Sequence, residues 1–185
     1  IKIFNLEKNM GIGHARNFAI KNTKNNIVAA LDSDVVPDKR WLINLYEYMI
    51  NNNSHLCGGL LIEKFLKENR YNYWRDTHIM HKFSEKEISN LQSFITGSNM
   101  ILKKDAWSKV NGFDEQFKTN GEDVHYCIKL RSNGFKISYT SDAYCYHLQN
   151  DNLESLLNRC WRYYISGTGL KKPSYKKLIL RSLKH

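Results

Sequence analysis

Asp32 and Asp34, separated by one residue, are the clearest side chains in this sequence that could do chemistry. They directly follow the apolar run 27–31, which predicts a buried strand. In open α/β sheets, ligands bind in the crevice beyond the carboxyl ends of the strands. A hard divalent cation such as Mg²⁺ or Mn²⁺ prefers carboxylate and phosphate oxygens, so the pair predicts a metal site. The alternative is an ordinary solvated turn before Pro37.

A second acidic pair, Glu122 and Asp123, follows Gly121 at the predicted start of a helix. Free backbone N–H groups and the helix dipole stabilise a carboxylate there, and simple capping is one interpretation. Capping needs only one acid, so the other could point into the crevice as a general base. His147 follows a Tyr-Cys-Tyr run and could complete an Asp/His metal shell, or it could be a structural histidine.

The elements that must position these residues follow from the pattern of apolar residues. Short apolar runs alternate with helical periodicity, which is typical of an α/β domain with strand and helix units packed around a largely parallel sheet. The sequence predicts strands over residues 1–6, 27–31, 56–62, 97–102 and 135–139, and helices after Gly11, behind Asp38, over 104–110, from Gly121 and behind Asp151 or Asn152.

Two of the predicted helices carry an apolar stripe that should face the core. Both begin behind residue types that cap helices, Asp38 in one case and Asp151 or Asn152 in the other. The stripes consist of Leu42, Leu45, Tyr46 and Met49, and of Leu153, Leu156, Leu157, Cys160, Trp161 and Tyr164.

Composition sets broad limits on the protein. A chain of 185 residues with 42% apolar composition has the length of one domain. It has no run of about eighteen apolar residues, so we expect a soluble, cytoplasmic protein. Its four cysteines are far apart, which favours reduced core residues over a zinc site or disulfides. The formal charge of +10 fits anionic partners such as nucleotide pyrophosphates, acidic lipids or nucleic acid, without choosing among them.

Several segments, taken in order, resemble the family-2 glycosyltransferases with the GT-A fold. Residues 9–17 are similar to the family's N-x-G-x-x-x-A-R-N segment, and residues 30–34 follow at the usual distance. The resemblance continues in the second half with residues 97–100, 110–115, 121–123 and 133–137, and then His147.

This resemblance implies an inverting enzyme that uses a nucleotide-sugar donor, usually a UDP-sugar, and a divalent metal, Mn²⁺ or Mg²⁺. Asp32, Asp34 and His147 would hold the metal, which stabilises charge on the departing diphosphate. Asp123 would take the proton of the attacking acceptor hydroxyl. The resemblance also assigns Asn9, Arg16, Asn17 and Ser33 to the nucleotide side, and Ser98, Asn99 and Glu122 to the acceptor side.

The resemblance also has limits at both ends of the chain. The family's fold begins with strands and helices that bind the uracil and ribose, and these are absent before residue 1, so we expect an N-terminally truncated GT-A domain over 1–168. The predicted strand 1–6 would then lack neighbours and leave an open edge. Residues 169–185 are expected to form a basic helix or tail, which either packs on the domain or contacts an anionic membrane surface peripherally.

The acceptor and two alternative functions complete these expectations. Residues 158–162 match a polymer-synthase signature only loosely, so we expect transfer of a single sugar to a glycan, lipid-linked or protein acceptor. The aromatic segment 63–94 is expected beside the active site. A catalytically silent binding or scaffold protein of the same fold is one alternative. A nucleic-acid-binding module is the other, but it gives no reason for the ordered carboxylates, so no nucleic-acid partner is expected.

Overall fold

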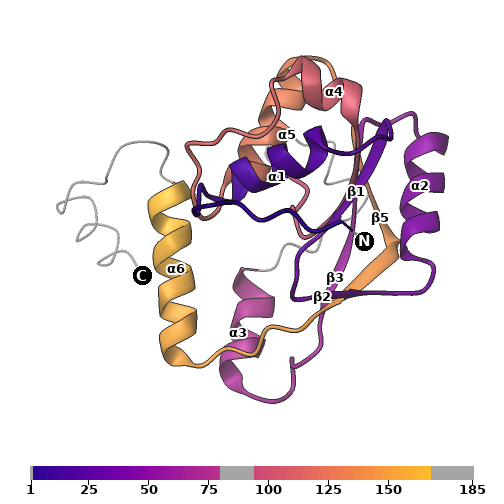
Figure 1. Cartoon of the computed structure of the whole chain (residues 1–185). Helices are drawn as coiled ribbons and strands as arrows, with labels where there is room; N and C mark the ends of the chain where they lie inside the picture. Colours follow the sequence, from indigo (N-terminus) through magenta and orange to yellow (C-terminus); the bar gives the residue numbers. More distant parts are fainter. Residues whose placement is uncertain (1, 80–93, 168–185) are drawn as a thin grey trace.

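The computed structural model describes residues 2–79 and 94–167, with only the backbone of residues 164–167 (Figure 1). The described residues form an α/β domain, as predicted. Its strands are β1 (Ile27–Leu31), β2 (Val35–Pro37), β3 (Leu56–Glu63), β4 (Asn99–Lys103) and β5 (Ile137–His147), and its helices are α1 (Ile12–Lys21), α2 (Trp41–Asn51), α3 (Arg70–His78), α4 (Lys104–Lys109), α5 (Glu122–Ser132) and α6 (Leu153–Gly167).

The strands form one mixed sheet in the order β1-β4-β3-β5-β2. Among the described strands only β3 and β5 pair in parallel, while β1 with β4, β4 with β3, and β5 with β2 pair antiparallel. This balance differs from the expected largely parallel sheet, because apolar runs report burial and carry no information on strand direction. The expected sheet flanked by helices is confirmed.

The core lies on both faces of the sheet. Alternating residues of one strand point to opposite faces, so Leu56 and Cys57 belong to different clusters. One cluster packs against α1, α4 and α5, and the other packs against α2 on the opposite face. Figure 1 shows α2 on one side of the sheet and α1, α4 and α5 on the other. Helices on both faces leave the strand ends as the place for a site.

An irregularity in the pairing of β3 with β5 sets the register near the strand ends. Gly59 pairs with Thr140, but the next residue, Leu60, pairs with Tyr144. The backbones approach so closely here that a Cβ on Gly59 would meet the carbonyl oxygen of Ala143 at 1.9 Å, so only glycine fits. Such bulges redirect the residues that follow them, and here those residues include the last ones of both strands.

Several details of the predicted elements are corrected by the structure. Residues 2–6 are not a strand, and they pair with no strand that the structure describes; instead Phe4 packs edge-on against Phe18 of α1, with ring centroids 5.5 Å apart. The predicted face of α2 is shifted, since Trp41 is buried with Leu45 and Met49 while Leu42 and Tyr46 are exposed. The buried residues repeat every four positions, which is one helix face.

The structure also shows how deeply the cysteines are buried and where β5 ends. Cys57, Cys127 and Cys145 are buried, as predicted, while Cys160 is half-buried. β5 extends to residue 147, well beyond the predicted end at residue 139, because the aromatic run before His147 continues the strand.

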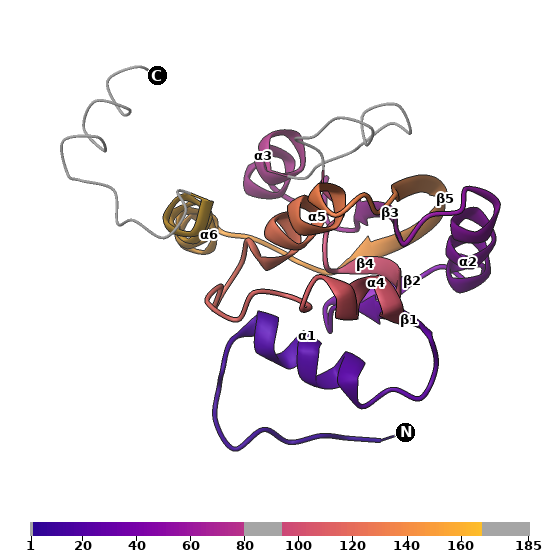
Figure 2. The ribbon, with the colours of Figure 1, turned by 90° about the horizontal axis from the view of Figure 1, so that it is seen from above.

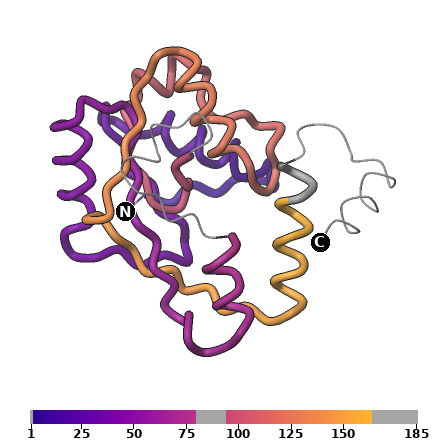
Figure 3. Tube along the Cα trace, turned by 180° about the vertical axis from the view of Figure 1, so that it is seen from behind, coloured from indigo at the N-terminus to yellow at the C-terminus, as the bar shows by residue number. Residues whose placement is uncertain are grey.

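Helix α6 lies apart from the sheet, at the opposite end of the molecule from α2 (Figures 2 and 3). Of its predicted stripe, Leu156 is buried, but Leu153, Leu157 and Trp161 are exposed. The basic segment 169–185 lies outside the described residues, and so does part of the aromatic segment, residues 80–93. Within the described part, no helix combines the length and apolar character needed to cross a membrane.

Candidate active site

A cavity of about 610 Å³ opens at the ends of β1, β3 and β5, between the start of α5 and helix α6. Its size is in the range of small-molecule sites in proteins. Among its lining residues are Arg16, Asp32, Asp34, Ser98, Glu122, Asp123 and His147. Residues predicted from distant parts of the sequence therefore meet in one cavity.

Asp123 lies in the first turn of α5, behind Gly121, whose left-handed backbone (φ 93°) starts the helix. Its Oδ2 accepts a hydrogen bond from the backbone N–H of Gly97 at 3.0 Å, and its Oδ1 accepts one from Val124 N–H at 2.8 Å. Each carboxylate oxygen keeps a second lone pair. The carboxylate is thus fixed at the cavity wall and can still accept a proton.

Glu122, the first residue of α5, is 2% exposed. Its Oε1 accepts a hydrogen bond from Nη1 of Arg16, while Oε2 has no partner in the part of the chain that the structure describes. Burial, reinforced by the charge of Asp123, raises the pKa of Glu122 to about 7, although Arg16 acts in the opposite direction. Glu122 is therefore poised to exchange a proton near neutral pH.

Arg16 of α1 bridges Glu122 and Asp32. Its Nη2 lies 3.0 Å from Oδ1 of Asp32, which is held at the end of β1 by a backbone bond to Ser98. The guanidinium lies against the backbone of Gly97, where a Cβ would come within 2.3 Å of it. The structure thus places Arg16, which the resemblance assigns to the nucleotide side, in the cavity wall, paired with two carboxylates.

His147 lies at the end of β5 between β3 and β2. It pairs with Val35 of β2, which brings the preceding Asp34 alongside, and with Glu63 at the end of β3. Its Nε2 lies 3.4 Å from Oδ2 of Asp34, and its Nδ1 lies 2.7 Å from Oε1 of Glu63. The Asp34 side chain is 47% exposed to the cavity side, whereas Glu63 is fully buried.

The family resemblance implies a divalent metal, which needs several oxygen or nitrogen ligands close together. In the described ranges, no three His, Cys, Asp or Glu side chains are arranged to hold a metal ion, and Asp32 is paired with Arg16. The predicted set of three is therefore not assembled here. Asp34 and His147 do fit as two ligands, since metal–ligand distances of about 2.1 Å put adjacent ligands about 3 Å apart. Phosphate oxygens would supply the rest.

Two predicted residues lie outside the cavity with their side chains committed elsewhere. The Asn17 amide binds the backbone N–H and carbonyl of Phe113 and accepts from the indole of Trp107. Buried Asn99 accepts from the indole of Trp41 at 2.6 Å and donates to the carbonyls of Leu60 and Ala143 at the β3–β5 irregularity. Both amides satisfy buried backbone groups, and their expected places near the nucleotide and the acceptor stay predictions.

The remaining predicted residues lie in turns. Asn9 accepts from the N–H of Gly11 at 2.9 Å in the turn before α1, and Ser33 is exposed between β1 and β2. Ser98 lines the cavity just before β4. None of these three residues is buried.

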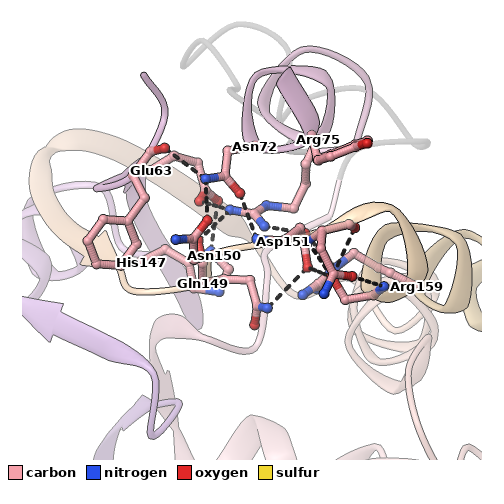
Figure 4. Close-up of polar contacts among 12 residues, drawn as sticks. Glu63, Asn72, Arg75, His147, Gln149, Asn150, Asp151 and Arg159 are labelled. Atoms are coloured by element: carbon pink, nitrogen blue, oxygen red, sulfur yellow. Dashed lines mark hydrogen bonds and ion pairs between the residues drawn. The ribbon is translucent and has the colours of Figure 1, made fainter. Parts of the chain in front are cut away.

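Sequence reasoning missed a buried charge cluster behind His147, which Figure 4 shows. Fully buried Arg75 of α3 donates to Glu63 and to Asp151, and both carboxylates are fully buried too. Burial alone would raise the pKa of Glu63, but hydrogen bonds from His147 and Arg75 outweigh it and leave that pKa below its ordinary value. The signal was an acid ending an apolar run at the same strand edge as His147.

The chain is similar to known proteins over most of its length. A family model described as glycosyltransferase-like family 2 matches residues 3–166. The pre-mycofactocin glycosyltransferase of Mycobacterium tuberculosis is 25% identical over 163 residues, which are 86% of this chain and 34% of that protein. The rhamnosyltransferase WbbL of Escherichia coli is 21% identical over 85% of this chain and 68% of that protein. The chain thus spans only a part of the mycobacterial protein.

Two solved structures share the fold. The mannosyltransferase PcManGT from Pyrobaculum calidifontis, in complex with GDP-Man and Mn²⁺, matches with a TM-score of 0.57 and 16% identity, over 88% of this chain and 45% of that one. TarS 1–349 of Staphylococcus aureus, in complex with UDP-GlcNAc, matches with a TM-score of 0.58 and 20% identity, over 82% of this chain and 43% of that one. At these identities the likeness shows the fold alone, and it confirms the GT-A fold.

The family model covers nearly all of the described chain, and the motifs that suggested the resemblance fall inside it in the expected order. The fold and the convergence of Asp34, Asp123 and His147 on one cavity agree with that match. This chain belongs to glycosyltransferase-like family 2.

Proposed function

We propose that this chain carries the active site of an inverting glycosyltransferase, which moves a single sugar from a nucleotide-sugar donor to a hydroxyl of a saccharide or lipid-linked acceptor. One observation carries the proposal: Asp34, His147 and Asp123, which lie far apart in the sequence, line one cavity at the strand ends. Family membership and the fold support the reaction class.

Asp34 and His147 are the residues we propose for a divalent cation, Mn²⁺ or Mg²⁺. A cation bound there would stabilise the negative charge that develops on the departing diphosphate. Asp32 remains paired with Arg16, so the positive charge of Arg16 is shared between Asp32 and Glu122. This assigns Asp32 to the wall of the site and leaves Asp34, the more exposed aspartate, to contact the ligand.

Asp123 is the proposed general base. The acceptor oxygen forms a bond to the anomeric carbon, the bond from that carbon to the diphosphate oxygen breaks, and the hydroxyl proton passes to Asp123. The hydrogen bonds from Gly97 and Val124 hold the carboxylate in one orientation for this transfer. A single displacement inverts the anomeric centre and needs no covalent sugar–enzyme intermediate.

The donor is proposed to be a UDP-sugar, as the resemblance implies. The two similar structures contain GDP-Man and UDP-GlcNAc, which supports a nucleotide-sugar donor. The nucleobase of that donor has to be determined by experiment. A thermal-shift screen of UDP, GDP and CMP, each with and without Mn²⁺, tests this directly. Stabilisation by UDP only when Mn²⁺ is present is the expected result.

The same screen has two other informative outcomes. Stabilisation by GDP or CMP in place of UDP would leave the proposed reaction class unchanged and assign a different nucleobase to the donor. No stabilisation by any of the three, together with no sugar transfer from the corresponding donors, would contradict the proposed function and support a catalytically silent binding protein of the same fold.

A further inference from the structure

The buried acid next to His147 has no part in the chemistry described so far. We propose that Glu63 is a positioning residue, which fixes the ring orientation and the tautomer of His147 so that Nε2 presents a lone pair to the cavity. The inference rests on the proposed function, because His147 is there a metal ligand. It deepens that function by assigning the residue that prepares His147 for binding.

The backbone places Glu63 and His147 side by side. They are register partners in the parallel pairing of β3 with β5, and they are the last residues of the two strands. The irregularity after Gly59 sets this register, since it shifts the partner positions on β5 from residue 140 to residue 144. The backbone N–H of Lys64 then donates to the carbonyl of His147 at 3.1 Å and closes the strand ends together.

The contact defines which ring nitrogen carries the proton. An ionised carboxylate only accepts hydrogen bonds, so Nδ1 of His147 must donate to Oε1 of Glu63 across 2.7 Å. In the neutral ring the proton then sits on Nδ1, and Nε2 is left as an acceptor. Nε2 is the nitrogen nearer to Asp34, at 3.4 Å, and both residues line the cavity. A carboxylate behind a metal-binding histidine acts in this way in known metal sites.

Arg75 holds the carboxylate in this orientation. Its Nη2 donates to Oε2 of Glu63 and to the carbonyl of Gln149 at 2.9 Å, and its Nη1 donates to Asp151. A guanidinium has only donors, so the Glu63 oxygen that faces Arg75 must be an acceptor. Glu63 is thus held between Arg75 and His147 (Figure 4). Of these two partners, His147 lines the cavity.

The cluster is itself anchored by α3 and by the segment that precedes α6. The amide of Asn72, one turn before Arg75 in α3, accepts from the backbone N–H of Asp151 at 2.7 Å and donates to Asn150 at 2.8 Å. These bonds tie α3 to the segment between β5 and α6. His147, at the start of that segment, is consequently held by packing from both strands and helices.

Glu63→Gln is the sharpest test because it changes one atom of the side chain and reverses the hydrogen bonding. The new amide has one oxygen and one NH₂, and the donor-only Arg75 requires the oxygen. The NH₂ must then face Nδ1 of His147, which becomes an acceptor, so the ring proton moves to Nε2. We expect ¹⁵N NMR of the protein without metal, at about pH 8.5 where a free imidazole is neutral, to show the Nδ1–H tautomer in the parent and the Nε2–H tautomer in Glu63→Gln.

Calorimetry with Mn²⁺ and UDP gives the second readout, in which Glu63→Gln should bind Mn²⁺ about 10- to 100-fold more weakly than the parent. The His147→Ala variant identifies the His147 signals among the seven histidines. Ser138→Ala is the matched control, because it removes a buried hydrogen bond between β5 and Ser54 at the far end of the same strands. It should leave both the tautomer and the Mn²⁺ affinity as in the parent.

The outcomes separate this inference from the proposed function. An Nε2–H tautomer in the parent, or an unchanged tautomer in Glu63→Gln, would overturn the positioning role without touching the reaction class. Parental Mn²⁺ affinity in His147→Ala would contradict the metal ligand of the proposed function, while the tautomer data would still decide what Glu63 does. The parent spectrum alone keeps the test decisive if Glu63→Gln does not fold.

Discussion

Two clusters have the same composition, an arginine between two carboxylates: the Arg16 cluster (Arg16, Asp32 and Glu122) lines the cavity, and the Arg75 cluster (Arg75, Glu63 and Asp151) lies buried behind His147. Around Arg75 all three side chains are fully buried, and the pKa values of Glu63 and Asp151 lie below their ordinary values. Around Arg16 the Asp32 side chain is 37% exposed, and the pKa of Glu122 is raised to about 7.

The difference shows what decides the state of a buried acid. Burial raises the pKa in both clusters, and the hydrogen bonds and charges around the carboxylate determine whether that effect is cancelled. Glu63 accepts from both His147 and Arg75, which lower its pKa, whereas the charge of Asp123 adds to the effect of burial on Glu122. The Arg75 cluster is a fixed ionic scaffold, and the Arg16 cluster can take up and release a proton.

The largest effect on activity is expected from Asp123→Asn, at the residue next to Glu122 of the Arg16 cluster. The amide cannot accept the hydroxyl proton, so transfer should fall by about 10²- to 10⁴-fold. The base acts only in the transition state, so UDP affinity in the presence of Mn²⁺ should stay within about twofold of the parent. Steady-state kinetics and calorimetry measure the two quantities, and turnover at the parental rate would remove Asp123 from its role.

The loss of stability on substitution should differ between Arg75 and Arg16. Arg75→Met should lower the free energy of unfolding by about 3–5 kcal/mol, because two buried ionised carboxylates lose their cation. Arg16→Met should cost clearly less, since Glu122 can become protonated and Asp32 reaches water. Urea unfolding at pH 7 provides both values. Equal losses in the two variants would show that the contrast between the clusters is wrong.

The pH dependence of stability should differ in sign between the clusters. The pKa of Glu122 is raised in the fold, so its favourable contribution is complete below pH 4.5 and is lost as the pH rises through about 7. Relative to Glu122→Gln, the parent should therefore lose about 2–3 kcal/mol between these pH values. Glu63 has a lowered pKa, so its contribution is instead lost as the pH falls. Unfolding curves of parent and variant across this range give the difference, and parallel curves would contradict it.

The smallest effect on the fold is expected from Asp34→Ala, because Asp34 belongs to neither cluster and is half exposed. The free energy of unfolding should change by less than about 0.5 kcal/mol. Mn²⁺-dependent UDP binding should nevertheless weaken by about tenfold or more, since a charged ligand is lost. Calorimetry on both proteins compares the affinities, and equal values would exclude Asp34 as a ligand.

The sequence predicted those parts of the site whose signals are local. Each signal marks one terminus of an element. The apolar run before Asp32 and the aromatic run before His147 mark the ends of strands, and the acids after Gly121 mark the start of α5. Strand ends meet at one edge of a sheet, where ligands bind. The order of these motifs then identified the family, which the family model confirms.

What the sequence could not predict depends on contacts between distant residues. Asn17 and Asn99 look like ligand-binding amides in isolation, and only the fold shows the buried backbone groups that they satisfy. Likewise, the pairing of Glu63 with Arg75 depends on how α3 packs against the strand ends. Strand direction has the same origin, because an apolar run is equally compatible with a parallel or an antiparallel neighbour.

The irregularity between Gly59 and Leu60 has an evolutionary consequence. It divides β5 into a segment around Tyr139, which packs in one core cluster, and a segment that carries Ala143 and Cys145 of the other cluster and ends at His147. The two segments therefore meet β3 in different registers on either side of its Gly59. Substitution of Gly59 is excluded by this arrangement, because a Cβ there would overlap the carbonyl oxygen of Ala143.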